Sequence, residues 1–138
     1  MPLDLLSQTG PMSDAVTRGI RVEVMSRHVP EHAPAREGQW VFEYTVRITN
    51  QSADTVQLVS RHWRITDALE QVREIKGSGV VGQQPVLKPD EQFQYSSWCP
   101  LTTPSGVMRG TYQMALEGGD VFDIEIAPFA LRARYTVH

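Results

Sequence analysis

The chain has 138 residues, 41% of them hydrophobic and 21% charged, which is enough to fold as one domain with its own core. Its formal net charge is −3 and no run of Lys or Arg occurs, which excludes the electrostatic footprint of a nucleic-acid-binding protein. The single cysteine, Cys99, excludes an internal disulfide and Cys-rich zinc motifs, so we expect it to be a small buried or half-buried residue.

The first segment, MPLDLLSQTGPMSD, has no basic stretch before its leucines and no long apolar run. We therefore read it as neither a signal peptide nor a membrane anchor, and we expect a cytoplasmic protein that does not insert into membranes. Because chain ends are commonly loose, we expect residues 1–14 to form a flexible arm and residues 15–138 to form the folded domain.

Apolar and polar residues alternate with a period of two along most of the remaining chain. This pattern is typical of strands with one face in water, and it recurs in GIRVEVMS, WVFEYTVRITN, VQLVSRHWRITD, EQFQYSSW and GTYQMALEGGDVFDIEIAPF. In VQLVSRHWRITD it places Val59, Trp63 and Ile65 on one side of a strand. We expect the core to include Phe42, Tyr44, Val46, Ile48, Trp63, Phe93, Tyr95, Tyr112 and Met114. The solvated strand faces are expected to carry Arg61, Arg64, Arg73 and Lys76.

Turn residues separate these runs, and no stretch keeps a helical period long enough to predict a helix. The plainest turn is Gly118-Gly119-Asp120, which lies between two alternating runs. About seven or eight short strands predict an all-β domain, built as two antiparallel sheets packed face to face or as a small barrel.

Residues Gly77 to Gly82 read GSGVVG, which matches the dinucleotide-binding spelling G-x-G-x-x-G. That mechanism needs a buried strand before the loop and a helix after it, whose free N–H groups face the phosphates. Here Pro85 and Pro89 follow the loop and forbid such a helix. We therefore expect a connection between two strands, and keep Gly77, Gly79 and Gly82 as the alternative site for a small phosphorylated ligand.

Four spaced motifs resemble the signature of the ApaG family, also called CorD. They are RHWRITD at 61–67, GSGVVGQQP at 77–85, PDEQFQYSS at 89–97 and GVMRGTYQM at 106–114. The resemblance extends from about residue 15 to the C-terminus. Three residues depart from the pattern, because Glu70, Asp90 and Trp98 stand where the family usually has glycine. At Glu70 and Asp90 this indicates turns that tolerate a side chain.

The resemblance implies a fibronectin type III-like, immunoglobulin-like antiparallel β-sandwich, in agreement with the strand pattern. It also implies a genetic association with cobalt resistance and with cobalt or magnesium efflux. Similar domains in eukaryotic F-box proteins and in a DNA-polymerase-interacting protein resemble protein-interaction modules. The family offers no catalytic residues to carry over, so we expect no catalytic site and no cofactor.

The cobalt and magnesium association raises the question of direct metal binding. In HVPEH, residues His28, Glu31 and His32 supply two imidazoles and a carboxylate, which can bind a transition metal. However, Pro30 places them in a loop, so their spacing fixes no common face, and no fourth ligand is evident. A divalent cation on this segment therefore remains an alternative hypothesis.

The leading hypothesis is a non-enzymatic interaction module with a protein partner of unknown identity. Function on β-sandwiches is carried by loops on a rigid scaffold, and exposed aromatic residues anchor interfaces. The residues expected to bind the partner are Gly77, Gly79, Val80, Val81, Gly82, Gln84 and Trp98. Alternation places the other candidate, Trp63, in the core. An edge strand could instead pair with a second copy of the chain, which leaves a homo-oligomer open.

Overall fold

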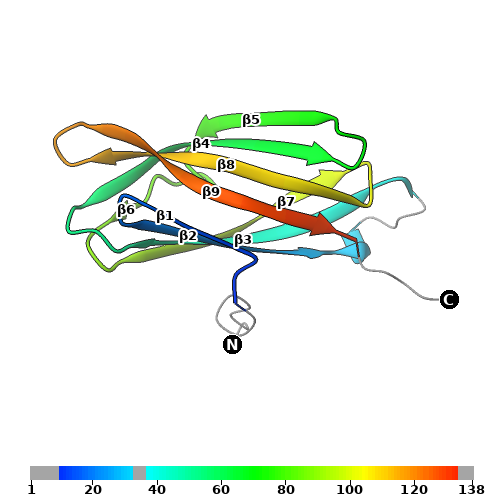
Figure 1. Ribbon diagram of the computed structural model, residues 1–138, viewed down its shortest axis with the longest axis horizontal. Helices are drawn as coiled ribbons and strands as arrows, with labels where there is room; N and C mark the ends of the chain where they lie inside the picture. Colours follow the sequence, from blue (N-terminus) through cyan, green and yellow to red (C-terminus); the bar gives the residue numbers. More distant parts are fainter. Residues whose placement is uncertain (1–9, 33–36, 134–138) are drawn as a thin grey trace.

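Two antiparallel sheets packed face to face form the part of the chain that this computed structural model describes, residues 10–32 and 37–133 (Figure 1). The first sheet has the strand order β1-β2-β3-β7 and the second the order β5-β4-β8-β9, with β6 paired to β4. The strands are β1 (Ser13–Thr17), β2 (Ile20–His28), β3 (Trp40–Asn50), β4 (Val56–Asp67), β5 (Val72–Ser78), β6 (Val86–Leu87), β7 (Gln92–Leu101), β8 (Ser105–Leu116) and β9 (Val121–Arg132). The predicted all-β sandwich is confirmed.

Strand β1 begins at Ser13, inside the segment that we expected to be an arm. It pairs with β2 across a tight turn in which Arg18 and Gly19 have φ angles of 50° and 81°. The sandwich therefore begins at or before Ser13, whereas residues 1–9 of the predicted arm lie outside the described residues. Within the described ranges, no helix is long and apolar enough to cross a membrane.

Period-two alternation builds the core as predicted, with one partial exception and one change of phase. Of the nine core residues predicted, all are buried except Phe93, which is partly buried against the core. In β4, a β-bulge between Leu58 and Ser60 adds one residue, Val59, to the strand. The bulge turns Leu58 into the core with Trp63 and Ile65, so the prediction that Val59 shares their face is wrong.

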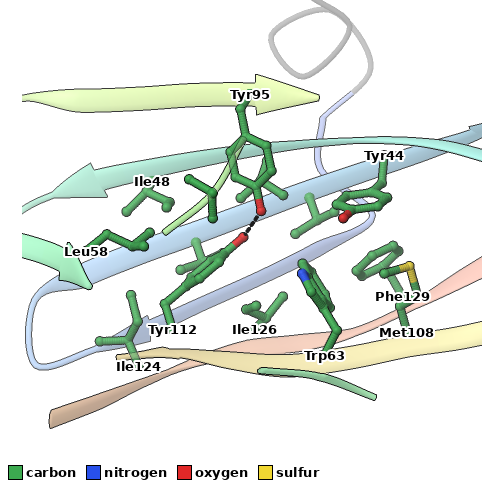
Figure 2. Packing of buried hydrophobic residues seen from close by; sticks show 14 of the residues in the cluster. Tyr44, Ile48, Leu58, Trp63, Tyr95, Met108, Tyr112, Ile124, Ile126 and Phe129 are labelled. Carbon is green, nitrogen blue, oxygen red and sulfur yellow. Dashed lines mark hydrogen bonds between the residues drawn. The ribbon is translucent and has the colours of Figure 1, made fainter. Parts of the chain in front are cut away.

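Aromatic rings fill the centre of the sandwich (Figure 2). Trp63 is fully buried, and its ring packs edge-on against Tyr44, Tyr112 and Phe129 with centroid distances of 5.3, 6.1 and 5.9 Å. A hydrogen bond of 2.5 Å between the hydroxyls of Tyr95 and Tyr112 joins the two sheets. The prediction that Trp63 is a core residue is thus confirmed.

The two flanks of the sandwich differ. On one flank, which we call the closed flank, β9 packs against β1 and β2. There the Ser26 Oγ donates to the Ala130 carbonyl at 2.7 Å, and the Glu125 N–H donates to the Thr17 Oγ1 at 3.1 Å. On the other, the open flank, β5 and β7 are the last strands of their sheets, and β5 is exposed along nearly its whole length.

Candidate functional site: a groove on the open flank

The glycine segment is a tight hairpin loop that leaves the end of β5. Gly79, at a φ of 61°, leads into a pair of 2.8 Å hydrogen bonds that join the backbones of Val80 and Gln83. Val81 and Gly82, at φ angles of 43° and 78°, form the turn between them. The chain then continues to β6, and no helix begins at Gly82. The prediction that this segment connects two strands is confirmed.

The backbone amides of Gly79, Val80 and Gln83 are engaged inside the protein. The Gly79 N–H donates to the Val59 carbonyl at 2.8 Å, and the N–H groups of Val80 and Gln83 close the hairpin. The Gln84 side chain also donates to the Val59 carbonyl, at 2.8 Å. A phosphate cradle requires free, convergent amides, so these contacts hold the loop on β4 rather than prepare it for an anion.

The glycines of the loop serve different purposes. A Cβ on Gly79 would lie 2.3 Å from the Gln83 carbonyl oxygen, so the backbone turn itself excludes a side chain. A Cβ on Gly77 would lie 2.9 Å from the Arg61 guanidinium, which is the movable end of a side chain. Gly82 has open space around it and needs only its positive φ.

Arg61 crosses over the bare backbone of Gly77. Its Nη1 donates to the carbonyls of Ser78 and Gly79 at 3.0 and 2.8 Å, and the residue is half-buried. The expectation of a solvated face is therefore wrong for Arg61, whereas Arg64, Arg73 and Lys76 are exposed. The alternation of the strand could have indicated this, because Arg61 is two residues from Trp63 and so lies on the same, inward face.

Two adjoining cavities, of about 240 and 250 Å³, run between β5 and β7 and share Ile65, Arg73 and Pro100. We call them together the edge groove. One end is lined further by Gln39, Asp67, Gln71, Val72, Leu101 and Thr102. The other is lined by Tyr44, Arg61, Trp63, Ile75, Ser97, Trp98, Cys99 and Met108. The edge groove therefore joins the glycine loop, through Arg61, to the exposed Trp98.

Arg73 reaches across the edge groove from β5 to β7. Its Nη2 donates to the Pro100 carbonyl at 3.0 Å and lies 3.7 Å from the Cys99 Sγ. Cys99 is buried, as predicted, and burial raises the pKa of its thiol while Arg73 acts in the opposite direction. A thiol with a raised pKa is a poor nucleophile, so Cys99 contributes to packing.

The arginines of the groove differ from those on the outer face of the first sheet in their partners. On that face, Arg21, Arg27 and Arg47 each contact a carboxylate, at 2.6, 2.9 and 3.1 Å. Among the described residues, Arg61 and Arg73 have no such ion pair and donate only to carbonyl oxygens and to sulfur. The groove thus contains two cations without an acidic partner.

The remaining predicted residues are distributed between surface and core. Val80 is buried and supports the loop from below, whereas Val81 and Trp98 are 52% and 48% exposed. Trp98 lies at the rim of the groove, because alternation in β7 turns Cys99 inward and Trp98 toward the outer face of the first sheet. There its cross-strand neighbour is Glu43, and the His32 ring packs edge-on against it at 4.7 Å.

The histidine segment does not assemble a metal centre. His28 is buried beside the Phe42 ring, at 5.4 Å, while Glu31 and His32 are exposed. Within the described ranges, no group of three or more His, Cys, Asp or Glu residues could hold a metal ion.

Comparison with known proteins gives a consistent result. The family model described as ApaG domain matches residues 30–116. The chain is 50% identical to Protein ApaG of Beijerinckia indica over 91% of this chain and 96% of that protein. It is 54% identical to Protein ApaG of Brucella canis over 87% of this chain and 92% of that protein. A crystal structure of the putative ApaA protein from Bordetella pertussis superposes with a TM-score of 0.81 at 48% identity, covering 91% of this chain and 99% of that chain.

Proposed function

The chain belongs to the ApaG family, and we propose that it is a non-catalytic module that binds a protein partner through the edge groove and the adjoining Gly77–Gly82 loop. The observation that carries this proposal is Trp98, which is 48% exposed at the rim of the groove on β7, the last strand of its sheet. Tryptophan is among the residues that most often dominate interface energies.

The loop supports the same proposal through a strained residue. Val81 is β-branched, 52% exposed and held at a φ of 43°, a conformation that costs such residues about 1–2 kcal/mol. Asn would relieve this strain, so the apolar side chain serves something other than folding. We propose that Val81 contacts the partner at the loop end of the edge groove.

Affinity capture from a native cell extract tests the proposal. The protein is immobilised as wild type, as Trp98→Ala and as Val16→Ala, and captured proteins are quantified by mass spectrometry. Val16 is a matched control because it is an exposed residue on the edge strand of the closed flank. We expect one partner whose recovery falls at least tenfold with Trp98→Ala and is unchanged with Val16→Ala. Equal recovery with all three proteins would contradict the proposal.

We further propose that the cobalt and magnesium association of the family is indirect and acts through that partner. The separation of His28 from the exposed Glu31 and His32 supports this view. Melting curves with CoCl₂ or MgCl₂ should therefore show no saturable rise in Tm. A saturable rise that disappears with His32→Ala would instead assign the ion to this chain.

A competing role for GSGVVG in binding a phosphorylated ligand is tested in the same format. Titration with ATP and with inorganic phosphate should leave the amide resonances of residues 77–82 unchanged. If shifts did occur, a variant would have to show that they come from binding at this loop. Gly82→Ala suits that purpose better than Gly79→Val, because a side chain at Gly79 would collide with the Gln83 carbonyl, whereas Gly82 has open space around it. Shifts that disappear with Gly82→Ala would favour the phosphorylated ligand.

A further inference from the structure

The inward face of β5 presents a regular series of chemical groups to the edge groove. Its register with β4 places Arg73 opposite Ile65, Ile75 opposite Trp63, and Gly77 opposite Arg61. Because Gly77 has no side chain, the Arg61 guanidinium lies over it and takes its place at the edge. Along the strand, the order is therefore cation, apolar residue, cation, at every second position.

The guanidinium groups of Arg61 and Arg73 are suited to binding an anionic ligand. Arg61 and Arg73 donate to neutral groups and have no ion pair among the described residues. The indole Nε1 of Trp63, on the inner wall, also has no hydrogen-bond partner among the described residues, although Trp63 is only 1% exposed. Figure 2 shows this nitrogen directed toward the opposite sheet.

The free edge of β5 determines what kind of molecule fits. β5 ends its sheet, and an exposed edge strand can accept an extended segment as an additional strand. The edge of β7 is less available, because Pro100 has no N–H and its carbonyl already accepts from Arg73. Figure 1 shows no element beyond β5 on this side of the second sheet.

Spacing distinguishes a peptide from a small anion. Positions 73 and 77 are four residues apart, which is about 13 Å along a strand. A single phosphate group spans only a few ångströms, whereas side chains i and i+4 of an extended peptide have this same separation and point to one face. Residue i+2 of such a peptide would lie opposite Ile75 and face the groove.

We propose that the edge groove binds an extended acidic segment of a partner protein, with the pattern acidic–x–apolar–x–acidic, as an added strand on β5. One carboxylate contacts Arg73, the other contacts Arg61 over Gly77, and the apolar side chain packs against Ile75, while Trp98 lies at the rim of the same groove. This inference rests on the proposed function and specifies the partner's chemistry.

Selection from a displayed library of random heptapeptides tests the pattern. The intact protein is the target, and Arg61→Gln/Arg73→Gln is the counter-target. The control Arg64→Gln/Arg109→Gln removes two exposed arginines that are cross-strand neighbours on the outer face of the second sheet. We expect enriched peptides to carry Asp or Glu at i and i+4 with an apolar residue at i+2. Their affinity should fall at least tenfold with the groove variant and stay unchanged with the control.

Gly77→Ala provides a finer test, because its Cβ collides only with the end of the Arg61 side chain. We expect this variant to fold normally and to weaken the selected peptide at least threefold. Replacing the one acidic residue opposite Gly77 with Gln should make the peptide insensitive to Gly77→Ala. Sensitivity that persists with the Gln peptide would overturn the placement of Arg61.

The outcomes separate the inference from the proposed function. Peptides that depend on Trp98 but carry no acidic pattern, or that bind the groove variant equally well, overturn the inference and leave the proposed function standing. Competition by inorganic phosphate or ATP at micromolar concentration also overturns it, in favour of a small anion. A selection that yields no binder of the open flank contradicts both.

Discussion

The two flanks of this sandwich solve the problem of an unpaired sheet edge in opposite ways. On the closed flank, β9 folds over β1 and β2, and the side chains of Ser26 and Thr17 bond to its backbone. On the open flank, β5 and β7 stay apart, and Arg73 reaches between them to the Pro100 carbonyl. One flank is thus closed by backbone and side-chain contacts, while the other keeps a free strand edge and two arginines without an ion pair among the described residues.

The two edges of the open flank also differ from each other. Natural proteins usually blunt free edges with charge, Pro or a covering element. Here Pro100 and Arg73 blunt β7, whereas β5 keeps its edge and places Arg73, Ile75 and the Arg61 guanidinium beside it. Stability and binding should therefore respond to different residues on the two flanks.

The largest contrast should come from truncating one aliphatic residue on each flank. Leu131 of β9 is fully buried, so Leu131→Ala should lower the free energy of unfolding by about 3 kcal/mol. Ile75 of β5 is partly exposed, so Ile75→Ala should cost less than about 1 kcal/mol. Urea unfolding followed by circular dichroism measures both. Equal losses would show that β5 is as firmly packed as β9.

Alkaline pH should lower the free energy of unfolding through the buried tyrosines that lie between the two flanks. Burial raises the pKa values of Tyr44, Tyr95 and Tyr112, so the folded protein keeps phenolic protons that the unfolded chain loses above about pH 10. This stabilisation is fully present below pH 10 and should decline by about 1.4 kcal/mol per pH unit per tyrosine as pH rises. Unfolding free energies measured from pH 8 to 11 test this, and Tyr112→Phe should make the decline shallower. An unchanged slope in that variant would contradict the assignment.

Loosening the closed flank should have a moderate effect. Ser26→Ala removes the 2.7 Å hydrogen bond to the Ala130 carbonyl and should cost about 1 kcal/mol. Amide exchange in β9 should accelerate while exchange in β5 stays unchanged. Ser96→Ala is the control, since Ser96 is exposed and its hydroxyl bonds to the hydroxyl of Thr45, on the outer face of the first sheet. A similar loss in both variants would remove the special role given to the closed flank.

The smallest effect on stability should come with the opposite sign. Val81→Asn relieves the strained φ of 43° and should raise the free energy of unfolding by about 0.5–1 kcal/mol. The same change should weaken partner capture at least threefold, because the apolar contact is lost. Thermal unfolding and the affinity capture measure the two quantities. A variant that is both more stable and fully competent in binding would exclude Val81 from the interface.

Local pattern predicted most of the fold, because long strands such as β3 alternate cleanly between buried and exposed residues. It failed where one residue changes the phase, as at the Val59 bulge. It also missed β1, whose five residues, SDAVT, carry too little alternation to stand out from a loose chain end. Alternation reports only on residues that are close in sequence. A bulge or a short strand is fixed by the strand it pairs with, which can be far away in sequence.

The candidate site was only partly visible in the sequence. Trp98 and the glycine loop could be named because their residue types are unusual. The edge groove could not, because it depends on the order of strands in two sheets, which places β5 and β7 on the same flank. Arg61 illustrates the limit, since its parity indicates an inward face, yet only the pairing with Gly77 shows how a charge fits there.

The central claim, that a partner binds the open flank, is tested most directly by site-specific photo-crosslinking in living cells. A photoreactive amino acid replaces Val72 on β5 or, as the control, Val16 on β1, two valines that are 47% and 56% exposed on edge strands of opposite flanks. We expect a discrete crosslinked partner at position 72 that vanishes with Trp98→Ala, and none at position 16. Crosslinking at position 16 with none at position 72 would contradict the account.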